Sequence, residues 1–307
     1  MDTQSFFDLL KIPYPTTQQG VIEKLIIERL IDQTAESYSI LNIGALLLAK
    51  NLYDFSDVSR KATRVVIYED KSNLNTRLNF TNEKGYAVGF QGLVGYVMSH
   101  LPQNEVIEDA LRKDTKLVPK VVIRELLANA LIHQDLDMTG TSPIVEVYKN
   151  RVKISNPGEP IVPVERFIDG YQSRNERLAS LMRGFGICEE RSSGIDRVVE
   201  TIELLQLPAP EFLVSYKRTA AVIHGARAFR DMNGSDRVRA CYQHCVLQWV
   251  LRKQMTNQSL RKRFGLSEKN ANTISQIITS AVTQKLIKND PNAPDSKRYA
   301  RYIPAWA

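Results

Sequence analysis

The alternation of apolar and polar residues is most regular between residues 124 and 133, where it predicts an amphipathic helix. Glu125, Asn129 and His133 recur every four residues, so at about 100° per residue they form one polar row along the helix. The opposite side is apolar and carries Ile123, Leu126, Leu127, Ala130 and Leu131. The helix therefore has a core face and a face that presents a carboxylate, a carboxamide and an imidazole in line.

This polar row has two interpretations. A carboxylate can orient or deprotonate a water molecule, and a carboxamide oxygen is a hard ligand suited to Mg²⁺. Alternatively, the row is the solvated side of an ordinary amphipathic helix and has no chemical role, which is the more common case. The choice between the two depends on the residues that follow the helix.

Patterns elsewhere in the chain predict a mixed α+β fold. Residues 1–60 are expected to be mainly helical, and a second helix is expected over residues 88–101. Period-two alternation predicts a strand over residues 62–69, a hairpin over 143–155 and two closing strands over 211–224. Strands and helices thus alternate along the central part of the chain.

Two glycine-containing turns flank a long segment of weak periodicity. The hairpin ends at Asn156-Pro-Gly158, where glycine permits a positive φ and a close backbone approach. Residues 159–193 are rich in arginine and are expected to form a functional lid. Ser192, Ser193 and Gly194 then open a helix, with Ser193 as the predicted N-cap. Such a start favours anion binding.

Composition excludes several classes of protein. The 307 residues contain no apolar run long enough to span a membrane, so no membrane partner is expected, and the N-terminus lacks the pattern of a signal peptide. Three cysteines give no disulfide framework, which favours the cytoplasm. Cys241, His244 and Cys245 fall in an apolar helical stretch and are interpreted as core residues rather than metal ligands.

Positive charge is concentrated at the C-terminal end. The net charge is +7, but residues 236–307 hold 13 basic and 4 acidic residues and carry +9 alone, which leaves −2 for the rest. Helices are predicted over residues 237–251, 256–264 and 267–285, followed by a basic hairpin. This order is typical of a winged helix, and the charge favours double-stranded DNA as its partner. The alternative is a protein-binding winged helix with an incidentally basic surface.

The predicted DNA contacts fall into two groups. Five side chains would line the exposed start of the recognition helix, where amides can read adenine edges and lysine can meet phosphates; they are Lys269, Asn270, Asn272, Thr273 and Gln276. Three further cations would contact phosphates from the wing: Lys297, Arg298 and Arg301.

Three motifs now stand in a fixed order: Glu125-x₃-Asn129, Asn156-Pro-Gly158 and Ser192-Ser-Gly194. This order resembles the GHKL ATPases, which include gyrase and the histidine kinases. More closely, it is similar to the ATP-binding domain called RecG-like C-terminal, which occurs in bacterial transcriptional regulators, often after a Schlafen/AlbA-type domain. The name of this domain refers to a helicase, but the chain contains no GxxxxGK[ST] P-loop, so we do not expect a helicase.

The resemblance implies a Bergerat-type α/β sandwich between two further units. We therefore expect an N-terminal α/β domain of unclear function over residues 1–86, a GHKL-like ATP-binding domain over 87–230 and a winged-helix domain over 231–307. It also implies ATP and Mg²⁺ as ligands of the central domain.

Roles follow from the resemblance by position. Glu125 would activate the attacking water, and Asn129 would ligate Mg²⁺ that bridges the phosphates. Asn156 would replace the adenine-reading aspartate of the family, with Gly158 in the adjoining turn. The backbone of Ser192, Ser193 and Gly194 would receive phosphate. His133 and Arg174 are secondary candidates for phosphate contact.

Two departures favour nucleotide binding over efficient hydrolysis. Asn156 stands where the superfamily has aspartate, and Ser192 stands where it has the first glycine of a Gly-x-Gly box. Our hypothesis is a regulator whose ATP site orders the lid and changes how the winged helix is presented, or how two copies pair as a homodimer. The alternatives are a weak Mg²⁺-dependent ATPase in DNA processing or phage defence, and a winged-helix module with a vestigial nucleotide pocket.

Overall fold

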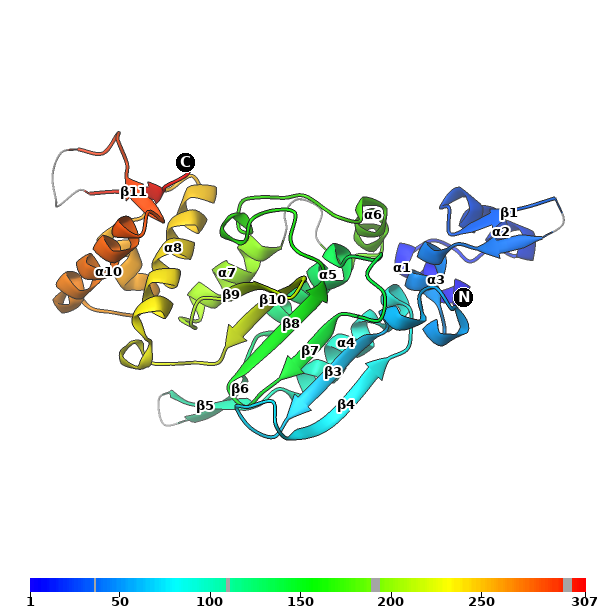
Figure 1. Cartoon of the computed structure of the whole chain (residues 1–307), viewed down its shortest axis with the longest axis horizontal. Helices are drawn as coiled ribbons and strands as arrows, with labels where there is room; N and C mark the ends of the chain where they lie inside the picture. The colour runs from blue at the N-terminus through cyan, green and yellow to red at the C-terminus, as the bar shows by residue number, and fades with distance from the viewer. Residues whose placement is uncertain (36, 109–110, 189–193, 295–299) are drawn as a thin grey trace.

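A six-stranded mixed sheet lies at the centre of the computed structural model, which describes residues 1–35, 37–108, 111–188, 194–294 and 300–307 (Figure 1). The strand order is β4-β3-β7-β8-β10-β9, and helices α4, α5 and α7 lie on one face of this sheet. The elements are β3 (Thr63–Tyr68), β4 (Thr76–Asn82), α4 (Tyr86–His100), α5 (Lys120–His133), β7 (Ile144–Val147), β8 (Arg151–Pro157), α7 (Ile195–Leu204), β9 (Glu211–Ser215) and β10 (Arg218–His224).

The alternating strands bury one face of the sheet and expose the other. Val145 and Val147 of β7 are buried, as are Val152 and Ile154 of β8. On the other face, Lys153 pairs with Glu146 across the β7–β8 ladder at 2.8 Å. The period-two pattern of the sequence thus predicts both the hairpin and the face that meets the helices.

Helix α5 packs in the middle of the molecule, against α4, α7 and β8. Its apolar residues are buried as the sequence predicts. The helix begins directly after Pro119, which is extended and suits a helix start. At its other end, Nδ2 of Asn175 donates to the carbonyl oxygens of Ile132 (2.7 Å) and Gln134 (2.8 Å), so a side chain from the lid caps the helix.

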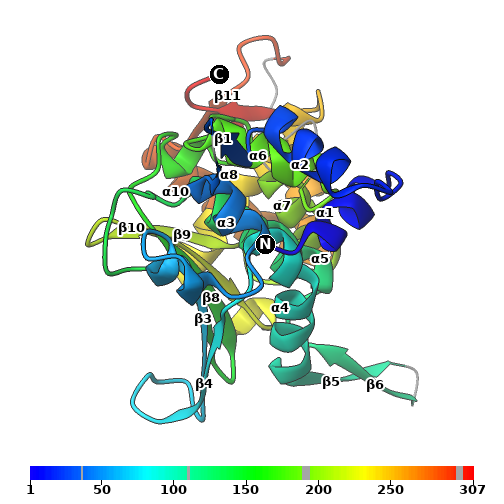
Figure 2. The same ribbon diagram turned by 90° about the vertical axis from the view of Figure 1, so that its right-hand side faces the viewer.

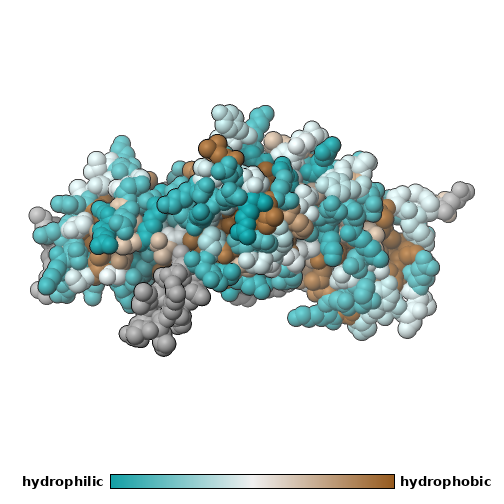
Figure 3. Space-filling view, turned by 90° about the horizontal axis from the view of Figure 1, so that it is seen from below, coloured by the Kyte–Doolittle hydropathy of each residue, from teal (hydrophilic) through white to brown (hydrophobic). Residues whose placement is uncertain are grey.

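The N-terminal region is largely helical, with one hairpin that the sequence did not predict. It comprises α1 (Thr3–Leu10), α2 (Gln18–Ile27), β1 (Ile31–Gln33), β2 (Tyr38–Ile40), α3 (Asn42–Leu48) and the 3₁₀ turns η1 (Leu52–Asp54) and η2 (Ser59–Lys61). Phe6 is fully buried and meets Phe185 edge to face, with ring centroids 5.9 Å apart. Apolar residues reach the surface at this end, on the right of Figure 3.

The central sheet begins before residue 87. Strands β3 and β4 lie within the region assigned to the first domain, yet β3 pairs directly with β7. A boundary at residue 86 would therefore divide one hydrogen-bonded sheet. The three-domain division stays a prediction.

Four further elements were not predicted from the sequence. The hairpin of β5 (Gln103–Glu108) and β6 (Leu111–Lys116) extends away from the body (Figure 2). The lid segment contains the 3₁₀ turn η3 (Val164–Arg166) and the helix α6 (Glu176–Gly184). The weak periodicity of the lid segment gave no sign of α6, although Leu178, Ala179, Leu181 and Met182 form a buried face on it.

The C-terminal region forms a compact helical unit with a small hairpin. Its elements are η4 (Phe229–Asp231), α8 (Gly234–Val250), α9 (Asn257–Arg263), η5 (Glu268–Asn270), α10 (Ala271–Thr283), β11 (Ile287–Asn289) and β12 (Tyr302–Pro304). Thr256 caps α9 through a capping box with Ser259, as its position predicts. The predicted helix over residues 267–285 begins with the 3₁₀ turn η5, so α10 proper starts at residue 271.

The C-terminal unit is joined to the body through polar contacts with the end of α7 and the loop after it. Nδ1 of His244 lies 2.8 Å from a carboxylate oxygen of Glu203, and Arg263 donates to the carbonyl of Leu207 at 2.7 Å. Cys241 and Cys245 are buried in the same region, which confirms their interpretation as core residues. In the described part of the chain, no helix combines the length and the apolar run that crossing a bilayer requires.

Candidate functional site

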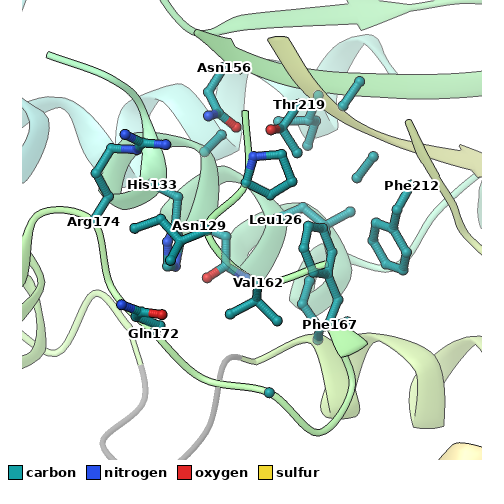
Figure 4. A pocket seen from close by; sticks show the side chains of 18 of the residues that line it. Leu126, Asn129, His133, Asn156, Val162, Phe167, Gln172, Arg174, Phe212 and Thr219 are labelled. Atoms are coloured by element: carbon teal, nitrogen blue, oxygen red, sulfur yellow. The ribbon is translucent and has the colours of Figure 1, made fainter. Parts of the chain in front are cut away.

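An apolar pocket lies between α5, strands β8 and β10, and the lid residues 160–174 (Figure 4). It has a volume of about 90 Å³. Ile154, Val162 and Phe167 are among its apolar walls. Six polar side chains also line it, from four separate parts of the chain: Asn129, His133, Asn156, Gln172, Arg174 and Thr219.

The polar row of α5 divides at this pocket. Asn129 and His133 line the pocket, whereas Glu125 lies one turn earlier, outside its lining, and is 4% exposed. Burial raises the pKa of Glu125, partly opposed by the charges of Arg124 and Arg197. A buried carboxylate and two partly buried side chains do not form a solvated helix face, but a chemical role for the row stays a prediction.

His133 and Arg174 approach the pocket with different charges. Burial, together with the charge of Arg174, lowers the pKa of His133 to about 4, so the imidazole is neutral at physiological pH. Arg174 lies 3.9 Å from Asp135 and also donates to the carbonyl of Glu159. Only Arg174 of the two can therefore offer a positive charge to an anion.

Asn156 lies at the end of β8, opposite Thr219 of β10 in the antiparallel ladder. Its Nδ2 donates to the carbonyl of Pro157 at 3.0 Å. This hydrogen bond fixes the carboxamide, so Oδ1 is the atom that can accept a hydrogen bond from a ligand. Oγ1 of Thr219 donates to the carbonyl of Gly158 at 2.7 Å. Sequence reasoning missed Thr219, since only the strand register brings it beside Asn156.

Gly158 is required by geometry for two reasons. Its φ is +102°, in the region that side chains rarely adopt, and an added Cβ would lie 2.9 Å from Cβ of Asp135. The backbone at Gly158 consequently runs close to the end of α5, which confirms the predicted positive φ and close approach. The turn was predicted over Asn156, Pro157 and Gly158, but Asn156 and Pro157 still belong to strand β8.

Gly194 brings the start of α7 against Glu125. It is the N-cap of α7 with φ +73°, and an added Cβ would lie 2.7 Å from Oε2 of Glu125. The prediction of Ser193 as N-cap is wrong, and Ser192 and Ser193 themselves lie outside the described residues. The next residue, Ile195, lines the pocket, so the positive end of the α7 dipole, the pocket and the Glu125 carboxylate meet here.

The lid supplies a wall that the sequence did not reveal. Phe167 lines the pocket and packs edge to face on Phe212 of β9, with ring centroids 5.2 Å apart. Gly170 closes the turn: its N–H donates to the carbonyl of Arg166 at 2.6 Å, and an added Cβ would lie 2.7 Å from a methyl group of Val162. Apolar residues scattered through an irregular segment show no period that would mark them as a wall.

The donor set is compatible with Mg²⁺ bound through a ligand, but it forms no dedicated metal cage. Over the described ranges, no group of three His, Cys, Asp or Glu residues could hold a metal ion. Protein-bound Mg²⁺ usually keeps several waters and takes one or two protein oxygens plus substrate phosphates. The carboxamide of Asn129 fits that mode.

The predicted DNA-contacting residues lie around the start of α10. Lys269, Asn272 and Gln276 are exposed, Asn270 and Thr273 are partly exposed, and Arg301 is exposed before β12. Lys297 and Arg298 lie outside the described residues. Thr273 and Gln276 also line a groove whose other walls include Arg237 and Arg239 of α8 and Glu165 of the lid.

Residues 140–223 match a family model described as "Putative ATP-dependent DNA helicase recG C-terminal". This stretch contains Asn156, Gly158, Arg174 and Gly194, and it ends before the C-terminal unit. It is thus similar to an ATPase-type domain, which confirms that part of the expected resemblance. The Schlafen-type and winged-helix assignments stay predictions.

Among solved structures, the DIP2311 protein from Corynebacterium diphtheriae is similar in fold, with a TM-score of 0.58 and 17% sequence identity. The alignment covers 89% of this chain and 56% of that protein, so the chain spans little more than half of its length. No curated protein matches the sequence. The likeness concerns the arrangement of elements alone.

Proposed function

We propose that the pocket binds ATP together with Mg²⁺, and that the C-terminal unit is a winged helix that binds double-stranded DNA under the control of this nucleotide. One observation carries the proposal. Asn129, Asn156 and Thr219 converge on an apolar pocket that reaches Ile195, the first residue of α7, next to its N-cap Gly194. A nucleotide needs such a combination of an apolar slot for the base and a positive helix end for phosphate.

The two ends of the pocket suit the two ends of a nucleotide. Near Asn156, a fixed Oδ1 acceptor matches the exocyclic amine of adenine, and the Thr219 hydroxyl lies beside it. At the other end, phosphates would lie toward Gly194, where the α7 dipole favours negative charge. Asn129 lies on α5 between Glu125 and His133, where its oxygen would ligate Mg²⁺ held by the phosphates.

The comparison supports the nucleotide half of the proposal. The matched stretch is similar to an ATPase-type domain, and it includes the base-side turn and the start of α7. The family description also names a DNA helicase, but DNA is favoured here by the charge of the C-terminal unit. Residues 236–307 carry +9, and their helices and hairpin follow the order of a winged helix.

Thermal unfolding with and without nucleotide tests the pocket. A ligand that binds only the folded state at 100 times its Kd adds about 2.7 kcal/mol of stability. We expect Mg²⁺ and ATP to raise the Tm of the wild type and to lose that effect in Asn129→Ala. Asn79→Ala, exposed on β4, is the matched control and should respond like the wild type. A wild type that shows no shift with ATP or ADP would refute nucleotide binding.

A further inference from the structure

The lid turn over residues 163–170 has two occupied faces. On one face, Phe167 and Gly170 line the nucleotide pocket. On the other face, the turn contacts the C-terminal unit, where Oη of Tyr242 in α8 donates to the carbonyl of Glu165 at 2.6 Å. A single short segment therefore separates the pocket from α8.

Trp306 extends this contact, and the four residues Glu165, Arg166, Tyr242 and Trp306 are called the latch below. The guanidinium carbon of Arg166 lies 3.8 Å from the ring centroid of Trp306, and Nε1 of Trp306 lies 3.3 Å from Oη of Tyr242, to which it donates. Arg166 is held by a two-pronged ion pair with Asp169, the shortest contact being 2.6 Å. Both faces of the turn are thus fixed by specific contacts.

The pocket has little free volume while the latch is closed. Its volume is about 90 Å³, whereas small-molecule sites usually begin near roughly 300 Å³. The walls formed by α5 and the sheet belong to the packed core, so the lid is the wall that can yield. Because the turn that carries Phe167 is compact, displacing Phe167 also displaces Glu165 and Arg166 and so disrupts their contacts with Tyr242 and Trp306.

We infer that nucleotide binding and the latch are antagonistic: the closed latch holds the pocket shut, and an entering nucleotide displaces the turn and releases Tyr242 and Trp306. This inference rests on the proposed function of the pocket. By linkage, the coupling is reciprocal. Opening the latch strengthens nucleotide binding by the same factor by which bound nucleotide shifts the latch toward its open state. Glu165 also walls the groove that contains Thr273 and Gln276, so its release changes the surroundings of the predicted recognition helix.

Calorimetric titration of Mg²⁺–ATP into latch variants tests the antagonism. Tyr242→Phe removes one hydroxyl and should bind Mg²⁺–ATP roughly two- to tenfold more tightly than the wild type, the range expected for one net hydrogen bond. Arg166→Gln, which removes the cation over Trp306, should act in the same direction and provides a second route if the first variant folds poorly. Tyr148→Phe is the matched control, since it removes a buried tyrosine hydroxyl bonded to Glu146, away from the lid.

Tryptophan fluorescence gives a second readout. The chain has two tryptophans, so Trp249→Phe leaves Trp306 as the single reporter. Acrylamide should quench Trp306 more efficiently once Mg²⁺–ATP is added, and adding Tyr242→Phe should produce part of that increase without nucleotide.

The outcomes separate the latch from the pocket. If the wild type binds Mg²⁺–ATP, but the latch variants bind it equally or more weakly, the antagonism is overturned and nucleotide binding stands. Unchanged quenching of Trp306 in the nucleotide-bound protein also overturns it. If neither the wild type nor the variants bind Mg²⁺–ATP, the latch inference and the proposed function fail together.

Discussion

Individual residues determine how closely the backbone can approach a ligand or a carboxylate at this site. Gly158 and Gly194 both have positive φ, and at both an added Cβ would lie under 3 Å from an atom of another segment. At Gly194 that atom is Oε2 of Glu125, so the glycine permits the contact between the start of α7 and the middle of α5. The same residue therefore serves both packing and the geometry expected at the phosphates.

Gly194→Ala should lower the free energy of unfolding by more than its backbone strain alone accounts for. Gly186 has a similar φ of +65° but nothing within 4 Å of an added Cβ, which makes Gly186→Ala the matched control. The control should lose about 1–2 kcal/mol of unfolding free energy from its left-handed backbone. Gly194→Ala should lose about 1–3 kcal/mol more, because its methyl group meets the Glu125 carboxylate. Urea unfolding of the two variants measures the difference, and equal losses would contradict it.

Among the elements, α7 connects the pocket to the C-terminal unit. Its first residue, Ile195, lines the pocket, and near its other end Glu203 bonds to His244 of α8. Arg263 of α9 is 4% exposed, and the charge of Glu203 opposes the lowering of its pKa by burial. The start of α7 therefore lies at the proposed phosphate end of the site, and its other end makes the polar contacts that join it to the basic C-terminal unit.

Removing Glu203 should loosen this joint. Glu203→Ala leaves His244 without its carboxylate partner and Arg263 without a nearby negative charge, so we expect a loss of about 1–3 kcal/mol in unfolding free energy. Glu200→Ala, exposed one turn earlier on the same helix, should change stability by less than about 0.5 kcal/mol. Urea unfolding compares the two variants, and a Glu203 variant as stable as its control would show that the joint is not held by this pair.

At the scale of the whole molecule, charge is divided along the longest axis. The C-terminal unit lies at one end of the molecule and the N-terminal helices at the other (Figure 1), and residues 236–307 carry +9 against −2 for the rest. A polyanion would therefore be attracted to one end of the protein, next to the lid and away from β1 and β2.

DNA affinity should fall steeply with salt and depend on this end alone. Each phosphate contact contributes about −0.9 to the slope of log K against log salt, so Lys269→Ala should weaken binding to every duplex and reduce the slope by about one. Lys71 is exposed in the loop between β3 and β4, and Lys71→Ala should leave the DNA affinity and the salt slope unchanged. Fluorescence anisotropy with labelled duplexes over a salt series measures the slopes. Identical slopes for the two variants would contradict a phosphate contact at Lys269.

Local sequence by itself determined much of the scaffold. Periodicity predicted α5, the β7–β8 hairpin, the closing strands and the C-terminal helices, because each buries one regular face and short-range spacing encodes that face. It also indicated Asn129, His133 and Asn156 as candidates, since they recur on one helix or end one strand, and the structure gathers them around one pocket. The turn glycine at 158 was evident for the same local reason.

Only the tertiary structure decided how the pocket is completed and covered. Thr219 reaches Asn156 through strand register, and Glu125 is buried because α7 begins against it, so neither fact is encoded in nearby residues. The sheet takes β3 and β4 from the region assigned to a separate domain, since strand pairing is long-range. Phe167 forms a pocket wall, and Arg166 stacks on Trp306, although 140 positions separate the two. Such contacts depend on packing between distant segments, for which local spacing carries no signal.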